Sequence, residues 1–260
     1  MKIREIVNAL ERFAPLSLQD SYDNAGLQIG LTVDADSTGA LLCLDVTEDI
    51  IDEAASKGCN IIISHHPLLF RPCKTISEKD YIGRCIIKAI QKGISIYSAH
   101  TNLDSAVGGV NYRISEKLGL ENIKALHEKP GTDGAGEGVT GMLPSETDSA
   151  SFIEKVKATF NAGCVRHNNC NRQIKKVALC GGAGAFLIND AIEAGADAFL
   201  TGEIGYHRFF GYEDNILLLE IGHYESEQYT IGLLHDILKG ANADFPIYEA
   251  SATTNPISYR

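Results

Sequence analysis

Histidine and carboxylate side chains gather at three places in the sequence, each directly after an apolar run with the composition of a strand. Imidazole and carboxylate groups together suit zinc, manganese, iron or cobalt, and spacing does not decide among these metals. The residues at the three places are His65 with His66, His100 with Asp104, and His223 with Glu227. Each feature alone is more often a solvated pair or a buried, hydrogen-bonded histidine. All three together follow strand ends, where α/β sheets build their sites, so they predict a metal centre.

The two adjacent histidines favour two metal ions over one. Neighbouring side chains normally point in different directions, so a single ion could take both His65 and His66 only if the chain turned sharply. Two ions about 3.5–4 Å apart would accept one imidazole each, with a carboxylate between them. We therefore predict that His65 and His66 bind two neighbouring divalent ions. Asp104 and His223 would complete the separate shells, and Glu227 would bridge the ions.

The spacing of His223 and Glu227 fits this arrangement. Residues four apart lie on one face of a helix, so a helix that begins near His223 would present both side chains together, while Glu225 would point elsewhere. Proton transfer would fall to other groups. His100 and His207 are the catalytic candidates, because each follows a predicted strand, although a buried, hydrogen-bonded role is equally open for His207.

Apolar runs alternate with helical patterns along the chain, which is typical of strand–helix–strand units and parallel sheets. Thr47 is a candidate N-cap and Gly58 a helix stop. The predicted strands cover residues 40–46, 59–63, 94–100, 175–180, 196–202, 215–222 and 245–251. The predicted helices cover residues 1–13, 48–57, 78–93, 185–195 and 224–240. This order predicts an α/β fold.

A glycine-rich stretch at residues 128–141 is interpreted as a crossing between domains or as an exposed hairpin. We place a domain boundary there. The first α/β domain would comprise residues 1–127 plus 215–260 and carry most metal ligands, and the second would comprise residues 128–214. Each of these two similar domains should have a central mixed sheet flanked by helices.

Composition limits the environment and the partners of the protein. The chain has 260 residues, 44% of them hydrophobic, which is enough for a substantial core. A formal net charge of −11 argues against a broad nucleic-acid or membrane surface. The seven cysteines are odd in number and scattered, and neither an export signal nor a transmembrane span stands out. We therefore expect a cytoplasmic protein with reduced thiols.

Two further motifs invite a functional interpretation. CVRHNNC (164–170) has two cysteines and a histidine at three-residue spacing, but a structural zinc site needs a fourth ligand, so an edge strand is favoured. GGAGAF (181–186) follows a strand and precedes a helix, as phosphate-binding loops do. It lacks the Lys-Ser/Thr of a P-loop, so a tight turn is favoured.

Five segments in fixed order resemble the NGG-interacting factor three family, whose bacterial members carry the name GTP cyclohydrolase I type II homologue. The similarity runs from about residue 3 to the C-terminal end. The segments are SYDNAGLQIG (21–30), IIISHHPLLF (61–70), SAHTNLD (98–104), the stretch 177–207 and IGHYESEQ (221–228). The chain departs from the family pattern at Tyr22, where Trp is common, and at Glu203, where Asp is common.

The resemblance implies a dinuclear metal site on the same five residues that spacing predicts: His65, His66, Asp104, His223 and Glu227. It also implies two similar α/β domains and a toroidal homohexamer, a trimer of dimers whose sites face an internal cavity. Longer members contain an inserted domain similar to the PII signalling proteins, for which this chain has no room. This is the short form.

Two functions of different classes remain open from the sequence. In the first, the chain is a metal-dependent hydrolase of a nucleotide or another phosphorylated small molecule, in line with the cyclohydrolase name. Two divalent ions carry more positive charge than the two carboxylates neutralise, which favours a small anionic substrate. In the second, the chain is a ring-forming metal-binding scaffold or regulatory interaction protein without catalysis.

Overall fold

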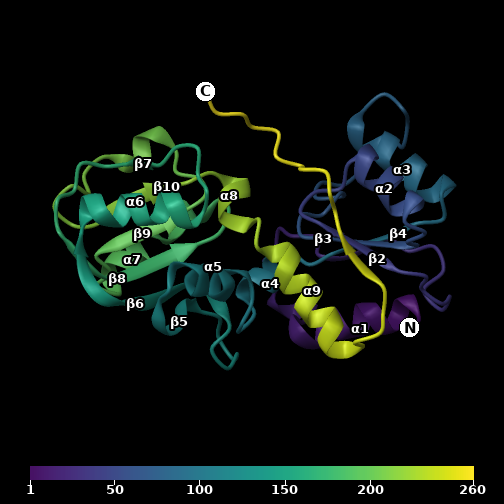
Figure 1. The fold of residues 1–260 in the computed structure, drawn as a ribbon, viewed down its shortest axis with the longest axis horizontal. Coiled ribbons are helices and arrows are strands. Elements are labelled where there is room, and N and C mark those ends of the chain that lie inside the picture. Colours follow the sequence, from purple (N-terminus) through teal and green to yellow (C-terminus); the bar gives the residue numbers. More distant parts are fainter. The chain divides into compact units, whose positions relative to one another are not determined.

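The structure is a computed structural model that describes residues 1–260, and the chain divides into two compact units (Figure 1). Unit 1 comprises residues 1–103 and 230–256, and unit 2 comprises residues 104–229 and 257–260. The chain therefore passes between the units three times, first within helix α4 (Thr101–Ser105). None of the helices combines the length and apolar composition that crossing a membrane requires.

Unit 1 contains a mixed five-stranded sheet in the order β1-β4-β3-β2-β11. β3 pairs in parallel with β2 and β4, β11 pairs in parallel with β2, and β1 is antiparallel to β4. The strands are β1 (Gly26–Ile29), β2 (Ala40–Cys43), β3 (Ile61–Ser64), β4 (Ser95–Ser98) and β11 (Ile247–Glu249). The helices are α1 (Ile3–Phe13), α2 (Glu48–Ser56), α3 (Tyr81–Gln91) and α9 (Thr230–Ala241), with a 3₁₀ turn η1 (Leu16–Leu18).

Helices cover both faces of the unit 1 sheet, as the continuous apolar strands require. α2 and α3 pack on one face, where residues such as Ile50 and Cys85 meet Ile62 of β3. α1 packs against α9, which lies against β2 (Figure 1). The predicted cap is confirmed, because the Thr47 side chain accepts a hydrogen bond from the Ile50 amide at the start of α2.

Unit 2 contains a mixed six-stranded sheet in the order β5-β6-β8-β9-β10-β7. β8, β9 and β10 are mutually parallel neighbours, while β5, β6 and β7 pair antiparallel. The strands are β5 (Glu121–Glu128), β6 (Gly136–Asp148), β7 (Arg166–His167), β8 (Gln173–Cys180), β9 (Ala198–Thr201) and β10 (Leu217–Glu220). The helices are α5 (Val110–Leu118), α6 (Ser149–Thr159), α7 (Ile188–Glu193) and α8 (His223–Glu227), with 3₁₀ turns η2 (Gly184–Leu187) and η3 (Tyr206–Phe209).

The predicted fold class, two mixed sheets flanked by helices, is confirmed. The chain passes from one unit to the other between residues 103 and 104, 229 and 230, and 256 and 257. The sequence placed these boundaries between residues 127 and 128 and between residues 214 and 215. The glycine-rich stretch is a hairpin inside unit 2, because β5 and β6 pair antiparallel across it.

The single helix predicted over residues 224–240 is wrong. It consists of α8 in unit 2 and α9 in unit 1. The apolar side chains Leu233, Leu234 and Leu238 are buried from α9, while α8 buries the polar residues Glu225 and Glu227. Two segments with such different buried faces do not continue one helix.

Candidate metal centre

His65 and His66 lie directly after β3, at the carboxyl end of a strand that is buried between β2 and β4. Their amides extend the pairing with β2, since they donate to the carbonyl oxygens of Cys43, the last residue of β2, and of Leu44 directly after it. His65 is fully buried, and its Nδ1 lies 2.8 Å from the carbonyl oxygen of Ala99. A carbonyl only accepts, so Nδ1 carries the hydrogen and Nε2 carries the lone pair that a metal binds.

Asp45 orients the second of these histidines. Its Oδ1 lies 2.8 Å from Nδ1 of His66, and its Oδ2 accepts a hydrogen bond from the Thr254 hydroxyl at 2.9 Å. Burial acts to raise the pKa of Asp45, but the hydrogen bond and charge of His66 outweigh it, so the pKa is lowered. The carboxylate therefore stays charged, and it fixes His66 with Nε2 as the ligating nitrogen.

His100 forms a third imidazole beside this pair. The centroid of its ring lies 5.4 Å from that of His65 and 5.7 Å from that of His66, within unit 1. Its Nδ1 lies 2.7 Å from Oδ1 of Asp23, whose other oxygen accepts from the Thr101 amide and hydroxyl. Burial opposes ionisation of Asp23, but hydrogen bonds from His100 and Thr101 outweigh it and lower the pKa to about 2.

Unit 2 brings His223 and Glu227 together. Glu203 follows β9 and His223 follows β10, so two parallel neighbouring strands end beside each other there. Nδ1 of His223 lies 2.8 Å from Oε1 of Glu203, and its Nε2 lies 3.1 Å from Oε2 of Glu227. The helix α8 begins at His223, which confirms the expected helical spacing. Glu225 is directed elsewhere, back toward Gly222.

The glycine loop after β8 packs against these two side chains. The amides of Gly181, Gly182 and Gly184 are already hydrogen-bonded to the side chains of Asn111, Ser226 and Thr201, so the loop is a tight turn rather than a phosphate cradle. Gly182 has φ +60°, and a Cβ there would overlap Oε1 of Glu227 and lie 3.2 Å from Nε2 of His223. Glycine is thus required by close approach to the candidate ligands.

The variant Gly182→Ala is expected to weaken metal binding about tenfold or more, because the added methyl group must displace Glu227 or His223. Gly195→Ala is the matched control. Gly195 also has a positive φ, +70°, but nothing lies within 4 Å of a Cβ there. Both variants should lose similar stability from backbone strain, on the order of 1 kcal/mol. Equal metal affinity in the two variants, measured by competition with a chelating dye, would contradict the account.

Asp104 lies in the last turn of α4 and is the first residue of unit 2. Its side chain is half-buried, and its carbonyl oxygen accepts a hydrogen bond from the Asn111 side chain at 3.0 Å. The same Asn111 accepts from the amide of Gly181. Asn111 therefore ties Asp104 to the loop that packs on His223 and Glu227.

His207 lies apart from the other candidates. It is exposed in η3, where its ring contacts those of Tyr206 and Phe210. No hydrogen bond or ion pair links it to His223 or Glu227. A proton-transfer role for His207 stays a prediction, and the surroundings of His100 fit that role better.

The CVRHNNC motif forms the edge strand β7 and the irregular residues on either side of it, as the sequence favoured. Cys164 and His167 are exposed, Nδ1 of His167 lies 2.9 Å from the Asn168 carbonyl, and Cys170 is buried. Burial raises the pKa of the Cys170 thiol, which disfavours the thiolate that metals bind. Ligand atoms of these three residues do not converge on one point.

We expect the double variant Cys164→Ser, His167→Gln to keep the wild-type metal stoichiometry. Both side chains are exposed, so the fold should tolerate the changes, and buried Cys170 is left in place. Elemental analysis after gel filtration measures the outcome. Loss of one metal equivalent per chain would show that this motif is a metal site after all.

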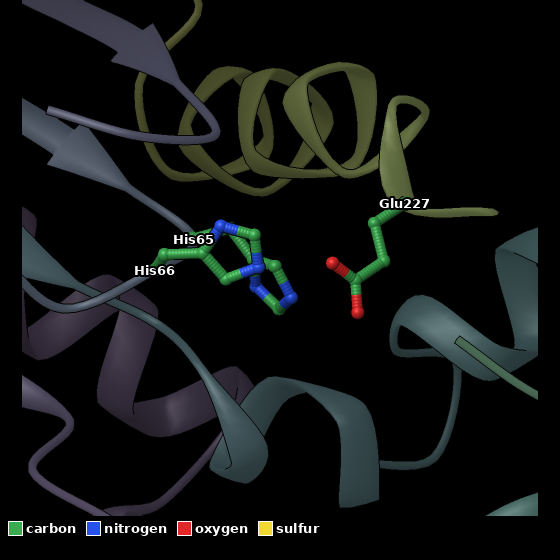
Figure 2. A group of neighbouring side chains, drawn as sticks. All are labelled: His65, His66 and Glu227. Atoms are coloured by element: carbon green, nitrogen blue, oxygen red, sulfur yellow. The ribbon is translucent and has the colours of Figure 1, made fainter. Parts of the chain in front are cut away.

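Three of the candidate ligands carry donor groups that suit a metal ion. His65, His66 and Glu227 offer two imidazoles and one carboxylate, a set that could hold a metal ion (Figure 2).

The acceptors that orient the histidines were not predicted from the sequence. Asp45 lies within a predicted strand run and Glu203 directly follows one, which is a usable signal, whereas Asp23 comes from a loop before β1.

The family model of Duf34/NIF3 (NGG1p interacting factor 3) matches residues 1–256. The chain belongs to the DUF34/NIF3 family. A relative from Clostridium perfringens (strain 13) is 38% identical over 229 residues, covering 87% of each chain. Another, from Clostridium acetobutylicum, is 33% identical over 270 residues and covers 100% of this chain and 99% of its own. Both bear the name GTP cyclohydrolase 1 type 2 homolog.

Solved structures share the fold of this DUF34/NIF3 protein. The hypothetical protein SA1388 of Staphylococcus aureus has a TM-score of 0.91 and 29% identity, with 100% of this chain and 99% of that chain covered. Reduced HcgD from Methanocaldococcus jannaschii has a TM-score of 0.80 and 27% identity, with 97% and 98% covered. The resemblance inferred from five sequence motifs is confirmed.

Proposed function

We propose that this DUF34/NIF3 protein is a divalent-metal-dependent hydrolase of a nucleotide or another phosphorylated small molecule. His65 and His66 from unit 1 would share a dinuclear site with ligands from unit 2. Those ligands are Asp104, His223 and Glu227. When bound, the two ions would supply Lewis acidity and positive charge for an anionic substrate. On the resemblance alone, we extend the proposal to a ring-shaped homohexamer in the cytoplasm.

One observation supports this proposal above the others. All three candidate histidine ligands have Nδ1 at 2.8 Å from an oxygen acceptor, namely the Ala99 carbonyl, Asp45 and Glu203. These contacts fix the orientation of each ring. For His65 and His66 they also favour the tautomer that ligates through Nε2, whereas both ring nitrogens of His223 face carboxylates. An isolated pair of this kind means little, since exposed His127 pairs with Asp190 in the same way. Three such rings together with buried Glu227 offer the donor types that catalytic metal sites use, which supports the proposal.

His100 is the group best suited to move a proton. Its Nδ1 is held by Asp23, whose lowered pKa keeps that carboxylate charged and therefore able to stabilise an imidazolium. Nε2 of the same ring would accept a proton from the attacking group and return it to the leaving group. Asp23 fixes the tautomer and the orientation for this step, as the carboxylate does in a carboxylate–histidine pair.

Protein loaded separately with zinc, manganese, iron or cobalt, assayed against phosphomonoesters, phosphodiesters and purine nucleotides, tests the proposal. We expect turnover of at least one anionic substrate class that requires metal and disappears in His65→Ala. Full metal occupancy without turnover on any substrate would remove the hydrolase and leave a metal-binding scaffold.

A further inference from the structure

A cavity of about 470 Å³ opens in unit 2 beside the edge strand β7 and the 3₁₀ turn η3. Cavities of this size hold small ligands. Three of its walls are aromatic rings: Tyr206, Phe209 and Phe210. Tyr206 is 67% exposed and Phe210 is 60% exposed, although both are large apolar groups. A gathering of exposed rings around a cavity points to a ligand that covers them.

The rings pack against one another and still expose more than half of Tyr206 and of Phe210. Tyr206 and Phe210 meet edge to face, with centroids 5.4 Å apart and planes at 74°, and His207 stacks on Phe210 at 28°. The guanidinium of Arg166 lies 5.3 Å from the centroid of Phe209. Flat aromatic faces and a stacked guanidinium are surfaces on which a planar heterocycle stacks.

Hydrogen bonds hold this wall in place before any ligand arrives. Nη1 of Arg166 donates to both carboxylate oxygens of Glu220 at 2.8 Å. The Asn168 side chain is committed to the backbone of β10, since it donates to the Ile216 carbonyl and accepts from the Leu218 amide. The side chains of Arg166 and Asn168 are therefore preorganised, which reduces the entropy lost on binding.

Charge disfavours a phosphate in this cavity. The positive charge of Arg166 is already matched by Glu220, and Glu213 adds an exposed carboxylate to the lining. Glu213 can accept hydrogen bonds from ring N–H groups. A neutral, planar, hydrogen-bond-donating ring fits these walls, and an anion does not.

The cavity and the unit 2 half of the candidate metal centre share one end of the sheet. Ile204, next to Glu203, donates its amide to Glu220 at the end of β10, and the chain then reaches His223. A ligand with its ring in the cavity would thus have its remaining part at the carboxyl ends of β9 and β10, where α/β sheets bind substrates.

We propose that this cavity is a base-binding pocket that takes a purine ring by stacking on Tyr206 and Phe210. The ring donates its N–H groups to Glu213. The link to catalysis rests on the proposed function, because the pocket would select nucleotides among phosphorylated substrates. Base binding itself requires neither metal nor turnover.

Guanosine binding to the full-length, metal-free protein, measured by calorimetry, tests the pocket separately from hydrolysis. We expect saturable binding of guanosine and none of ribose 5-phosphate, which has no base. Phe210→Ala and Tyr206→Ala should each weaken guanosine binding about tenfold, as loss of a stacking face does. Glu213→Gln should weaken it severalfold. Phe186→Ala is the control, because Phe186 is a 50% exposed ring of unit 2 that does not line the cavity.

Guanosine binding that is absent, or equal in Phe210→Ala, Tyr206→Ala and Phe186→Ala, would overturn the pocket. A change of oligomeric state in Phe210→Ala without guanosine binding to the wild type would also overturn it and assign the rings to a contact with a second copy. Hydrolysis of simple phosphoesters without guanosine binding would leave the proposed function standing and remove only the pocket. Guanosine binding without hydrolysis of any substrate would leave the pocket standing and remove the proposed hydrolase function.

Discussion

Purified His65→Ala and Glu227→Ala proteins are expected to contain almost no bound metal while they remain folded. Substitution of groups that merely orient a ligand lowers metal affinity about 10- to 100-fold, so removal of a ligand should cost at least as much. His65 follows β3 and Glu227 ends α8, and neither belongs to the apolar core clusters. Elemental analysis beside a thermal melt measures both quantities.

His127→Ala is the matched control for these variants. Nδ1 of His127 lies 2.8 Å from Asp190, as in the candidate ligands, but its side chain is 56% exposed on β5. This variant should keep full metal content. Because His65 is fully buried, its loss can also destabilise the fold by about 1–3 kcal/mol. Glu227→Gln keeps the side-chain volume and removes the charge, so it separates loss of metal from loss of stability. Full metal occupancy in Glu227→Gln would refute the role of Glu227 as a ligand.

Bound metal is expected to leave the protein as the pH falls below about 6.5, the usual pKa of imidazole, because only a neutral imidazole is a ligand. The orienting carboxylates do not share this transition. The pKa of Asp45 is lowered, and that of Asp23 is lowered to about 2. A carboxylate whose pKa is lowered in the folded protein stabilises the fold at pH values above its ordinary pKa of 3.8. For Asp23 this stabilisation is lost as the pH falls through about 2. Metal should therefore be lost between about pH 7 and 5 without unfolding.

Turnover, metal content and circular dichroism recorded on the same samples from pH 5 to 8 test this expectation. Turnover should fall together with metal content while the dichroism stays constant. A turnover that stays flat while the metal is lost would contradict a metal-dependent reaction. Metal loss that coincides with unfolding would contradict the separate roles of the imidazoles and the carboxylates.

Local signals predicted most elements because they depend on neighbouring residues. Thr47 caps α2 through its own side chain, and the β-branched run before His65 is the fully buried strand β3. The spacing of His223 and Glu227 likewise predicted a shared helix face, and their side chains lie 3.1 Å apart. In each case the pattern and its physical cause lie within a few residues.

Long-range contacts were beyond the reach of such patterns. The break between α8 and α9 depends on which unit buries each segment, and no glycine or proline marks it at Gln228. Asp23 orients His100 from 77 residues away, and Glu203 orients His223 from 20 residues away. The sequence favoured a tight turn at Gly181 and Gly182 over a phosphate-binding loop, but it gave no sign of the close approach of Glu227 that requires glycine there.

An anomalous-scattering crystal structure of the metal-loaded protein tests the central claim most directly, since it locates each ion and its ligands in one measurement. We predict two peaks per chain, with the Nε2 atoms of the three histidines and oxygens of the two carboxylates at about 2.0–2.2 Å, the distances typical of such ligands. The predicted ligands are His65, His66, Asp104, His223 and Glu227. Loaded crystals without a peak at His65 and His66, or with ions bound only by other residues, would contradict the account.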